Sequence, residues 1–166
     1  MIAVRRATVA DAEVVGRIHA ASWRGAYQQL GPAFLASIVD QERIDLWTRV
    51  IGEDEEPVYV APADAPTGFI YFGPSRDDDA GEHVGEVMTF YAHPEAWGTG
   101  VGRALMEVAI AELCAMGFTE AMLWVLEDNP RARRFYEMAG WRVDGGTKHQ
   151  SWRGAEFDEV RYRIAL

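Results

Sequence analysis

Apolar residues along the chain follow two periods, one near 3.6 and one of two, which predict helices and strands in one mixed α+β domain. Val101, Leu105 and Ala109 belong to the apolar stripe of an amphipathic helix. Thr8, followed by Asp11, forms a capping box that starts the first helix. Helices are expected around Val14–Ala21, Phe34–Ile38, Gln41–Val50, Val101–Ala109 and Ala132–Ala139. Strands are expected over Ile2–Arg5, Val58–Val60, Gly68–Phe72, Val84–Ala92, Ala121–Leu126, Trp141–Val143 and Glu156–Ile164.

The length favours a single domain over residues 1–166, because 166 residues suit one packed core and are too few for two. The stretch Gly73–Glu82, with three successive aspartates at 77–79, is expected to be an exposed loop whose charges face solvent. Cys114 is the sole cysteine, so no internal disulfide can form. Its place late in an apolar helix favours a core position.

The formal net charge of −10 argues against nucleic acid or an anionic membrane as the main partner, because phosphate groups select basic surfaces. The same charge favours a cationic ligand such as an amine. No run approaches the roughly 20 apolar residues of a membrane span, and Met1–Ala7 lacks the pattern of a signal peptide. The four histidines show no spacing typical of a metal site. We therefore expect a cytoplasmic protein without metal, nucleic acid or membrane among its partners.

A glycine-rich turn lies between a predicted strand and a predicted helix. It places Gly98, Gly100 and Gly102 at alternate positions, where the absence of Cβ lets a ligand approach the backbone closely. The helix that follows starts with unpaired N–H groups and the positive end of its dipole. These features favour an anion site suited to a pyrophosphate. The alternative is a tight connection without a ligand, and the spacing matches neither of the common nucleotide-binding glycine motifs.

Two linked stretches resemble a known family. Glu86–Met106, with His93-Pro94 ahead of the glycine turn, resembles motif A of the GNAT N-acetyltransferases, and Asn129–Trp141 resembles motif B. The resemblance implies the GNAT fold, with a central mixed, mostly antiparallel, twisted sheet of six to seven strands flanked by about four helices. It also implies an acetyl-CoA-dependent N-acetyltransferase, which we expect to be bacterial.

The resemblance assigns the cofactor-binding residues. Backbone groups of Phe90, Tyr91 and Ala92 would pair with the pantetheine arm of acetyl-CoA as if it were an added strand, and Asn129 would bond the same region. The pyrophosphate would be held by the loop residues Trp97, Gly98, Thr99, Gly100, Val101, Gly102 and Arg103. Independently of the resemblance, the excess of arginine over residues 129–143 favours phosphate recognition, with Arg131 and Arg133 as added phosphate contacts, although a solvated helix face explains each arginine equally well. Trp97 stands where the family usually carries Gln or Arg, which puts one phosphate contact in doubt.

The same resemblance suggests catalytic residues. Removing a proton from an alkylammonium at pH 7 costs about 4.6 kcal/mol, so a general base or a water chain is useful. Glu86 stands where one branch of the family carries its catalytic glutamate, and the alternative is that it faces solvent or pairs with an arginine. Tyr136 matches the usual general acid, and the alternative is a core aromatic. A backbone N–H near Tyr91 is expected to meet the oxyanion.

The acceptor pocket is less well defined by the sequence. Trp23 and Tyr27, one helical turn apart, lie where the first helices of the family cover the acceptor, and they form either an aromatic wall for a cation or part of the core. We expect a small cationic amine as acceptor. A protein or peptide amine, and a sensor that binds acyl-CoA without turnover, are the alternatives. A homodimer is also expected.

Overall fold

The computed structural model describes residues 1–166 and is built on one seven-stranded sheet with the strand order β1-β2-β3-β4-β5-β7-β6. Only β4 and β5 run parallel, and every other neighbouring pair is antiparallel. The strands are β1 (Arg5–Arg6), β2 (Val58–Ala61), β3 (Gly68–Pro74), β4 (Val84–Ala92), β5 (Glu120–Leu126), β6 (Arg142–Trp152) and β7 (Ala155–Ala165). The α-helices are α1 (Ala12–Ala26), α2 (Pro32–Ala36), α3 (Asp40–Glu53), α4 (Val101–Ala115) and α5 (Pro130–Met138). The predicted α+β fold and its mostly antiparallel sheet are confirmed.

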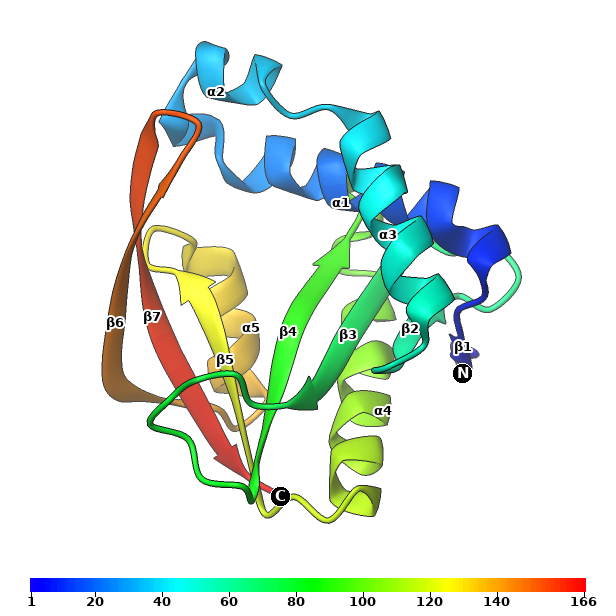
Figure 1. Ribbon diagram of the computed structural model, residues 1–166, viewed down its shortest axis with the longest axis vertical. Coiled ribbons are helices and arrows are strands. Elements are labelled where there is room, and N and C mark those ends of the chain that lie inside the picture. Colours follow the sequence, from blue (N-terminus) through cyan, green and yellow to red (C-terminus); the bar gives the residue numbers. More distant parts are fainter.

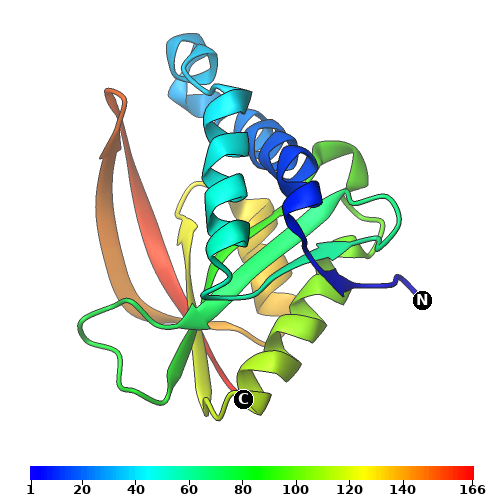
Figure 2. The ribbon, with the colours of Figure 1, turned by 45° about the vertical axis from the view of Figure 1, so that its right-hand side comes forward.

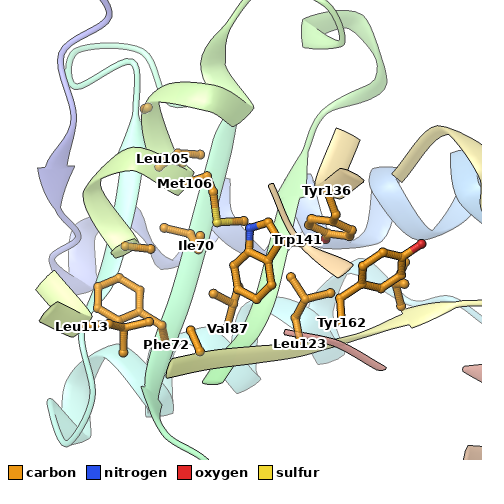
Figure 3. Close-up of a cluster of buried hydrophobic side chains, with 14 of the residues drawn as sticks. Ile70, Phe72, Val87, Leu105, Met106, Leu113, Leu123, Tyr136, Trp141 and Tyr162 are labelled. Atoms are coloured by element: carbon orange, nitrogen blue, oxygen red, sulfur yellow. The ribbon is translucent and has the colours of Figure 1, made fainter. Parts of the chain in front are cut away.

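The helices form a layer on each face of the sheet (Figures 1 and 2). α1 and α3 pack on one face, where Val15 and Trp47 join Phe69 of β3 in one buried cluster. α4 and α5 pack on the other face (Figure 3). There the buried cluster joins residues of both helices to the sheet, among them Leu105, Met106, Tyr136, Ile70, Phe72, Val87, Leu123, Trp141 and Tyr162. The sheet therefore separates two cores, and a site that uses both layers must pass through it.

The parallel pair β4–β5 is short, and this opens the sheet. Pairing is limited to Val84–Glu86 of β4 with Glu120–Met122 of β5, after which the two strands diverge (Figure 1). On its other side β4 stays paired with β3 as far as Ala92. The register of that pair shifts between Tyr71 and Phe72, which leaves Met88 as a bulged residue at the start of the opening. Beyond the short pairing, the edge of β4 that faces β5 has no strand partner.

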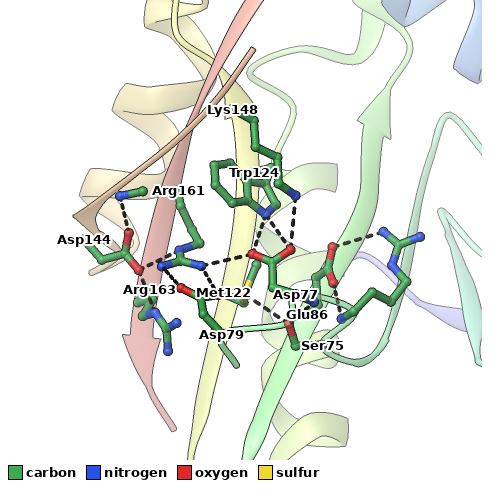
Figure 4. A network of polar contacts seen from close by, with 12 residues as sticks. Ser75, Asp77, Asp79, Glu86, Met122, Trp124, Asp144, Lys148, Arg161 and Arg163 are labelled. Carbon is green, nitrogen blue, oxygen red and sulfur yellow. Dashed lines mark hydrogen bonds and ion pairs between the residues drawn. The ribbon is translucent and has the colours of Figure 1, made fainter. Parts of the chain in front are cut away.

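The acidic loop after β3 differs from the prediction. The Asp77 carboxylate accepts hydrogen bonds from Trp124 Nε1 (3.0 Å), Lys148 Nζ (3.1 Å) and Arg161 (3.0 Å), and Asp79 also binds Arg161 (Figure 4). The interpretation of this run as a solvated face is therefore wrong for Asp77, whose side chain is mostly covered, whereas Asp79 pairs with Arg161 but remains exposed. Their cationic partners lie 71 to 84 residues further along the chain, so the local sequence gave no sign of the network.

Three smaller predictions are settled by the fold. The capping box is confirmed, since the Thr8 backbone N–H donates to Asp11 Oδ2 at 2.8 Å. The core position predicted for Cys114 is wrong, because the thiol is exposed on α4. The last strand pair is much longer than predicted, since β6 continues through the polar stretch to Trp152 and the tip of the β6–β7 hairpin reaches α2 (Figure 1). None of the helices has the length and apolar character that crossing a bilayer requires.

Candidate active site

A cavity of about 860 Å³ occupies the opening between β4 and β5. Its lining comes from both layers, with Ser22 of α1 and Tyr27, the C-cap residue of that helix, on one side and Met106 of α4 and Phe135 of α5 on the other. Because the two strands have diverged, no backbone hydrogen bonds close the sheet between these sides. The cavity therefore connects the two faces of the sheet, so that two molecules entering from opposite layers could meet inside it.

The glycine turn forms one end of this cavity. Gly98 and Gly100 have positive φ angles of +79° and +93°, which side chains other than glycine rarely adopt. α4 begins directly after Gly100 without a side-chain cap, and the Ala104 N–H is bonded to the Gly100 carbonyl at 3.1 Å. The three preceding N–H groups, those of Val101, Gly102 and Arg103, thus have no partner within the helix. Together with the helix dipole they form an anion site.

Gly102 lets the start of α4 lie close against β4. A Cβ atom at this position would approach Cζ of the Phe90 ring to 3.2 Å, and the ring of Phe135 to 3.6 Å. The two phenylalanine rings themselves pack with centroids 5.4 Å apart. The absence of a side chain at Gly102 therefore keeps the anion site next to the open edge of β4.

The open edge of β4 presents alternate backbone groups to the cavity. The His93 N–H donates to the Thr67 carbonyl at 2.7 Å, on the β3 side. Because backbone groups alternate in direction along a strand, those of Tyr91 also face β3, and those of Phe90 and Ala92 face the cavity. The Ala92 carbonyl already accepts from Ser22 Oγ and Trp97 Nε1, each at 2.9 Å. This orientation contradicts the backbone contact predicted between Tyr91 and the pantetheine arm, whereas backbone groups of Phe90 and Ala92 face the cavity, next to Tyr91, where the oxyanion donor is predicted.

Trp97 supports an arginine at the same end of the cavity. The guanidinium carbon of Arg131, in the first turn of α5, lies 3.5 Å from the centroid of the Trp97 ring. Arg131 lines the cavity and makes no hydrogen bond to the protein, so its donors are free. Burial lowers the pKa of Arg131 from its ordinary value, but guanidinium remains charged at neutral pH. The stacked Arg131 therefore supplies a cation beside position 97, where the family usually carries Gln or Arg and this chain has Trp.

Tyr136 lines the cavity from α5. The side chain projects from α5 into the buried cluster and is 7% exposed (Figure 3). Burial raises the pKa of the hydroxyl above its ordinary value, and no hydrogen bond within the protein engages it. The hydroxyl is therefore protonated at neutral pH and available as a donor to a bound molecule.

Glu86 lies away from the cavity, contrary to the prediction. It is buried in the part of β4 that still pairs with β5 and is not among the lining residues. Its Oε2 accepts from the Arg76 backbone N–H at 2.9 Å, and its Oε1 accepts from the Arg76 guanidinium at 3.0 Å (Figure 4). Both oxygens are thus engaged in holding the loop after β3. This geometry contradicts a role for Glu86 as the catalytic base and matches the alternative of an arginine pair.

The other predicted site residues divide into two groups. The cavity is lined by Phe90, Tyr91, Ala92, Trp97, Gly98, Gly100, Gly102, Arg103, Asn129, Arg131, Tyr136 and Tyr27. Asn129 also caps α5, since its side-chain oxygen accepts from the Ala132 N–H at 3.1 Å. Thr99, Val101, Arg133 and Trp23 do not line it. Arg133 instead binds the Tyr162 hydroxyl and the Glu127 carbonyl, each at 3.1 Å.

Trp23 lies outside the cavity lining and makes contacts within the protein. Its Nε1 donates to the Tyr91 hydroxyl at 2.7 Å, and the Arg43 guanidinium lies 5.4 Å from the Trp23 ring. Of the two residues predicted to form an aromatic wall, Tyr27 lines the cavity and Trp23 does not.

Sequence reasoning missed Ser22, Trp124 and Glu159, which all line the cavity. The period of two along β7 places Glu159 on the same face as Phe157, which is a signal that could have found it.

Comparisons with known proteins agree with this geometry. The family model described as "Acetyltransferase (GNAT) family" matches residues 15–141. The uncharacterised N-acetyltransferase YuaI of Bacillus subtilis is 32% identical over 133 residues, covering 78% of this chain and 75% of that protein. A mycothiol acetyltransferase of Geodermatophilus obscurus is 41% identical over 81 residues, which are 47% of this chain and only 25% of that longer protein.

Two solved structures share the fold. The ribosomal-protein-alanine N-acetyltransferase of Brucella melitensis superposes with a TM-score of 0.74 at 23% identity, covering 98% of this chain and 99% of that one. The PaiA N-acetyltransferase of Thermoplasma acidophilum, solved in complex with coenzyme A, superposes with a TM-score of 0.72 at 19% identity, covering 98% of both chains. At these identities the likeness concerns the fold.

Proposed function

Because the chain belongs to the acetyltransferase (GNAT) family and is an acetyl-CoA-dependent N-acetyltransferase, we propose that its acceptor is the primary amine of a small cationic molecule. The observation that carries this proposal is the cavity between β4 and β5. Its lining combines an anion site and an arginine with aromatic rings and a carboxylate. A phosphate-bearing donor and a cationic acceptor would therefore enter from opposite faces of the sheet.

The anion site and Arg131 support a specific placement of acetyl-CoA. The free N–H groups of Val101, Gly102 and Arg103 would bind the pyrophosphate, with Arg131 as the charged side-chain contact. The pantetheine arm would follow the edge of β4 and bond the backbone of Phe90 and Ala92. Such binding would satisfy backbone groups that β5 leaves unpaired.

The position of Tyr136 supports direct transfer. The amine nitrogen would attack the thioester carbonyl carbon, the new C–N bond would form, and the C–S bond would break. Tyr136 would donate its proton to the leaving sulfur. Because the thiol of CoA resembles free cysteine, with a pKa near 8.5, the thiolate leaves readily and the acid contributes moderately.

The remaining features of the proposal come from composition and fold together. Residues 1–166 share one sheet from β1 to β7, which supports a single catalytic domain. The net charge of −10 supports a cationic acceptor, since it raises the local concentration of cations. A cytoplasmic location and a homodimer remain predictions from the sequence.

Replacing Arg131 with Gln is expected to raise the Kd for acetyl-CoA about tenfold. The substitution removes a charged contact to a phosphate, made by a guanidinium that the Trp97 ring already holds in position. Calorimetric titration of the purified protein with acetyl-CoA measures the change. Arg134→Gln is the matched control, since Arg134 is an exposed arginine of the same helix outside the cavity. Equal affinities of the two variants would contradict the assignment of Arg131.

The acetyl transfer itself is tested by release of the CoA thiol. The protein is incubated with acetyl-CoA and with primary amines pooled by size and charge, and thiol is measured against an amine-free control. Faster release with a pool of small cationic amines is the expected result. Release only with peptide amines would overturn the acceptor class, and a rise in melting temperature with acetyl-CoA but no release from any pool would favour a sensor.

A further inference from the structure

Glu159 is a carboxylate in the cavity without a cationic partner. It lies in the middle of β7, opposite Leu126 of β5 and Lys148 of β6, and it lines the cavity. Its one hydrogen bond comes from Gln150 Nε2, at 3.2 Å. The other carboxylate that lines the cavity, Glu107, binds Arg103 at 2.8 Å. Glu159 therefore stands out as a charge that the folded chain has not neutralised.

The cations closest to Glu159 are committed elsewhere. Lys148 is its direct neighbour across the β6–β7 pair, but the Lys148 ammonium binds Asp77 at 3.1 Å and lies 4.0 Å from the centroid of the Trp124 ring. Arg161, two residues along β7, binds Asp77, Asp79 and Asp144 (Figure 4). Three aspartates thus draw both cations away from Glu159. A partly buried carboxylate left unpaired costs stability, unless a bound cation compensates.

Aromatic side chains line the cavity together with this carboxylate. They are Tyr27, the C-cap residue of α1, and Trp124 of β5. The Tyr27 ring packs against Phe157, which lies two residues before Glu159, with centroids 5.7 Å apart. Burial is the main reason that the pKa of Tyr27 and that of Tyr91 are raised, and the charge of Glu159 adds to both shifts, so Glu159 lies within electrostatic range of each ring. Rings beside a carboxylate suit an ammonium group carried on an apolar or aromatic body.

We propose that Glu159 receives the ammonium group of the acceptor and takes its proton as the nitrogen attacks. This inference rests on the proposed function and names the acceptor as a primary alkylammonium whose carbon skeleton packs on Tyr27 and Trp124. In the reaction one N–H proton of the ammonium passes to a Glu159 oxygen and a second passes to water as the C–N bond forms, the C–S bond breaks, and the leaving sulfur takes the proton of Tyr136. The two side chains return to their resting states by releasing one proton to water and taking one from it.

The proposal predicts how kcat/KM depends on pH through the ionisation of Glu159. Burial raises the pKa of the Glu159 carboxyl, while the hydrogen bond from Gln150 and the charge of Lys148 lower it. The other titratable groups that face it are Tyr27 and Tyr91, which stay neutral because burial raises the pKa of each. The carboxyl must be ionised to accept a proton, so kcat/KM falls as the pH drops through its raised pKa.

The test compares Glu159→Gln with the wild type, using phenethylamine as the probe of a primary alkylammonium. We expect kcat/KM for the amine to fall about 100-fold, and Glu159→Asp to recover part of the loss. The acidic limb of the pH profile should disappear in Glu159→Gln. Binding of acetyl-CoA and the melting temperature should not fall, because the substitution removes an unpaired charge. Glu156→Gln is the matched control, being an exposed glutamate of the same strand outside the cavity.

A second measurement keeps this inference separate from the proposed function. Calorimetric titration of phenethylamine into the CoA-bound protein needs no turnover, and the wild type should bind at least tenfold more tightly than Glu159→Gln. If the wild type binds this cation through Glu159 but transfers no acetyl group, the proposed function fails and the ammonium site stands. If turnover occurs, but Glu159→Gln matches the wild type in kcat/KM, pH profile and amine affinity, the inference is overturned. Absence of amine binding by both proteins would also overturn it.

Discussion

Replacing Tyr136 with Phe is expected to lower kcat about 100-fold, at the low end for a general acid because the CoA thiolate leaves readily, while leaving the affinity for acetyl-CoA and the melting temperature close to those of the wild type. The loss follows from removing the proton donor to the leaving sulfur, since general acids contribute roughly 10²- to 10⁴-fold. Stability should survive because the hydroxyl makes no hydrogen bond within the protein, and the phenyl ring keeps the packing of the cluster. Steady-state kinetics with a reactive amine, calorimetric titration and thermal melting measure the three quantities.

Tyr162→Phe is the control for this substitution, because the same chemical change there should have the opposite effects. Tyr162 is fully buried, and its hydroxyl donates to Glu137 at 2.8 Å and accepts from Arg133 at 3.1 Å, away from the cavity. Loss of these bonds should cost about 1 kcal/mol of unfolding free energy, and kcat should stay within about twofold. If Tyr136→Phe keeps the kcat of the wild type, Tyr136 is not the acid.

Features that depend on one short stretch of the sequence were predicted best. The helix over Val101–Ala115 follows from its apolar stripe, and the anion site from glycines directly ahead of that helix. Both depend on neighbours a few residues apart, so periodicity and local backbone preference determine them. Tyr136 was placed correctly in the cavity for the same reason, as its position follows from the motif on α5.

Features that depend on partners far apart along the chain were not predicted from the sequence. Glu86 fits a catalytic position along the strand, but its side chain is taken up by Arg76 in a loop that returns to β4. Glu159 carried no motif, and its importance depends on Asp77 attracting Lys148 and Arg161 across two strand pairs. Whether a charged residue is neutralised or free is decided by long-range pairing, which one sequence does not display.

The largest effect on acetyl-CoA binding is expected from Gly102→Asp, which should raise the Kd more than about 100-fold while maintaining or increasing thermal stability. Gly102 is the second residue of α4, and its N–H is one of the three free donors at the anion site. A carboxylate there favours the helix by about 0.3–1 kcal/mol through the dipole. The same carboxylate repels the pyrophosphate: two unit charges about 5 Å apart at an effective dielectric of ~20 interact by about 3 kcal/mol.

Gly102→Asn separates the effect of charge from that of volume, because asparagine has nearly the shape of aspartate. Both side chains meet the Phe90 ring at the same close Cβ contact of 3.2 Å, so any shift of that ring affects both variants equally. Calorimetric titration with acetyl-CoA should therefore show Gly102→Asn intermediate between the wild type and Gly102→Asp. Thermal melting should rank Gly102→Asp at or above Gly102→Asn. Opposite changes in stability and affinity exclude a folding defect, whereas equal affinities of the two variants would show that no phosphate lies at the start of α4.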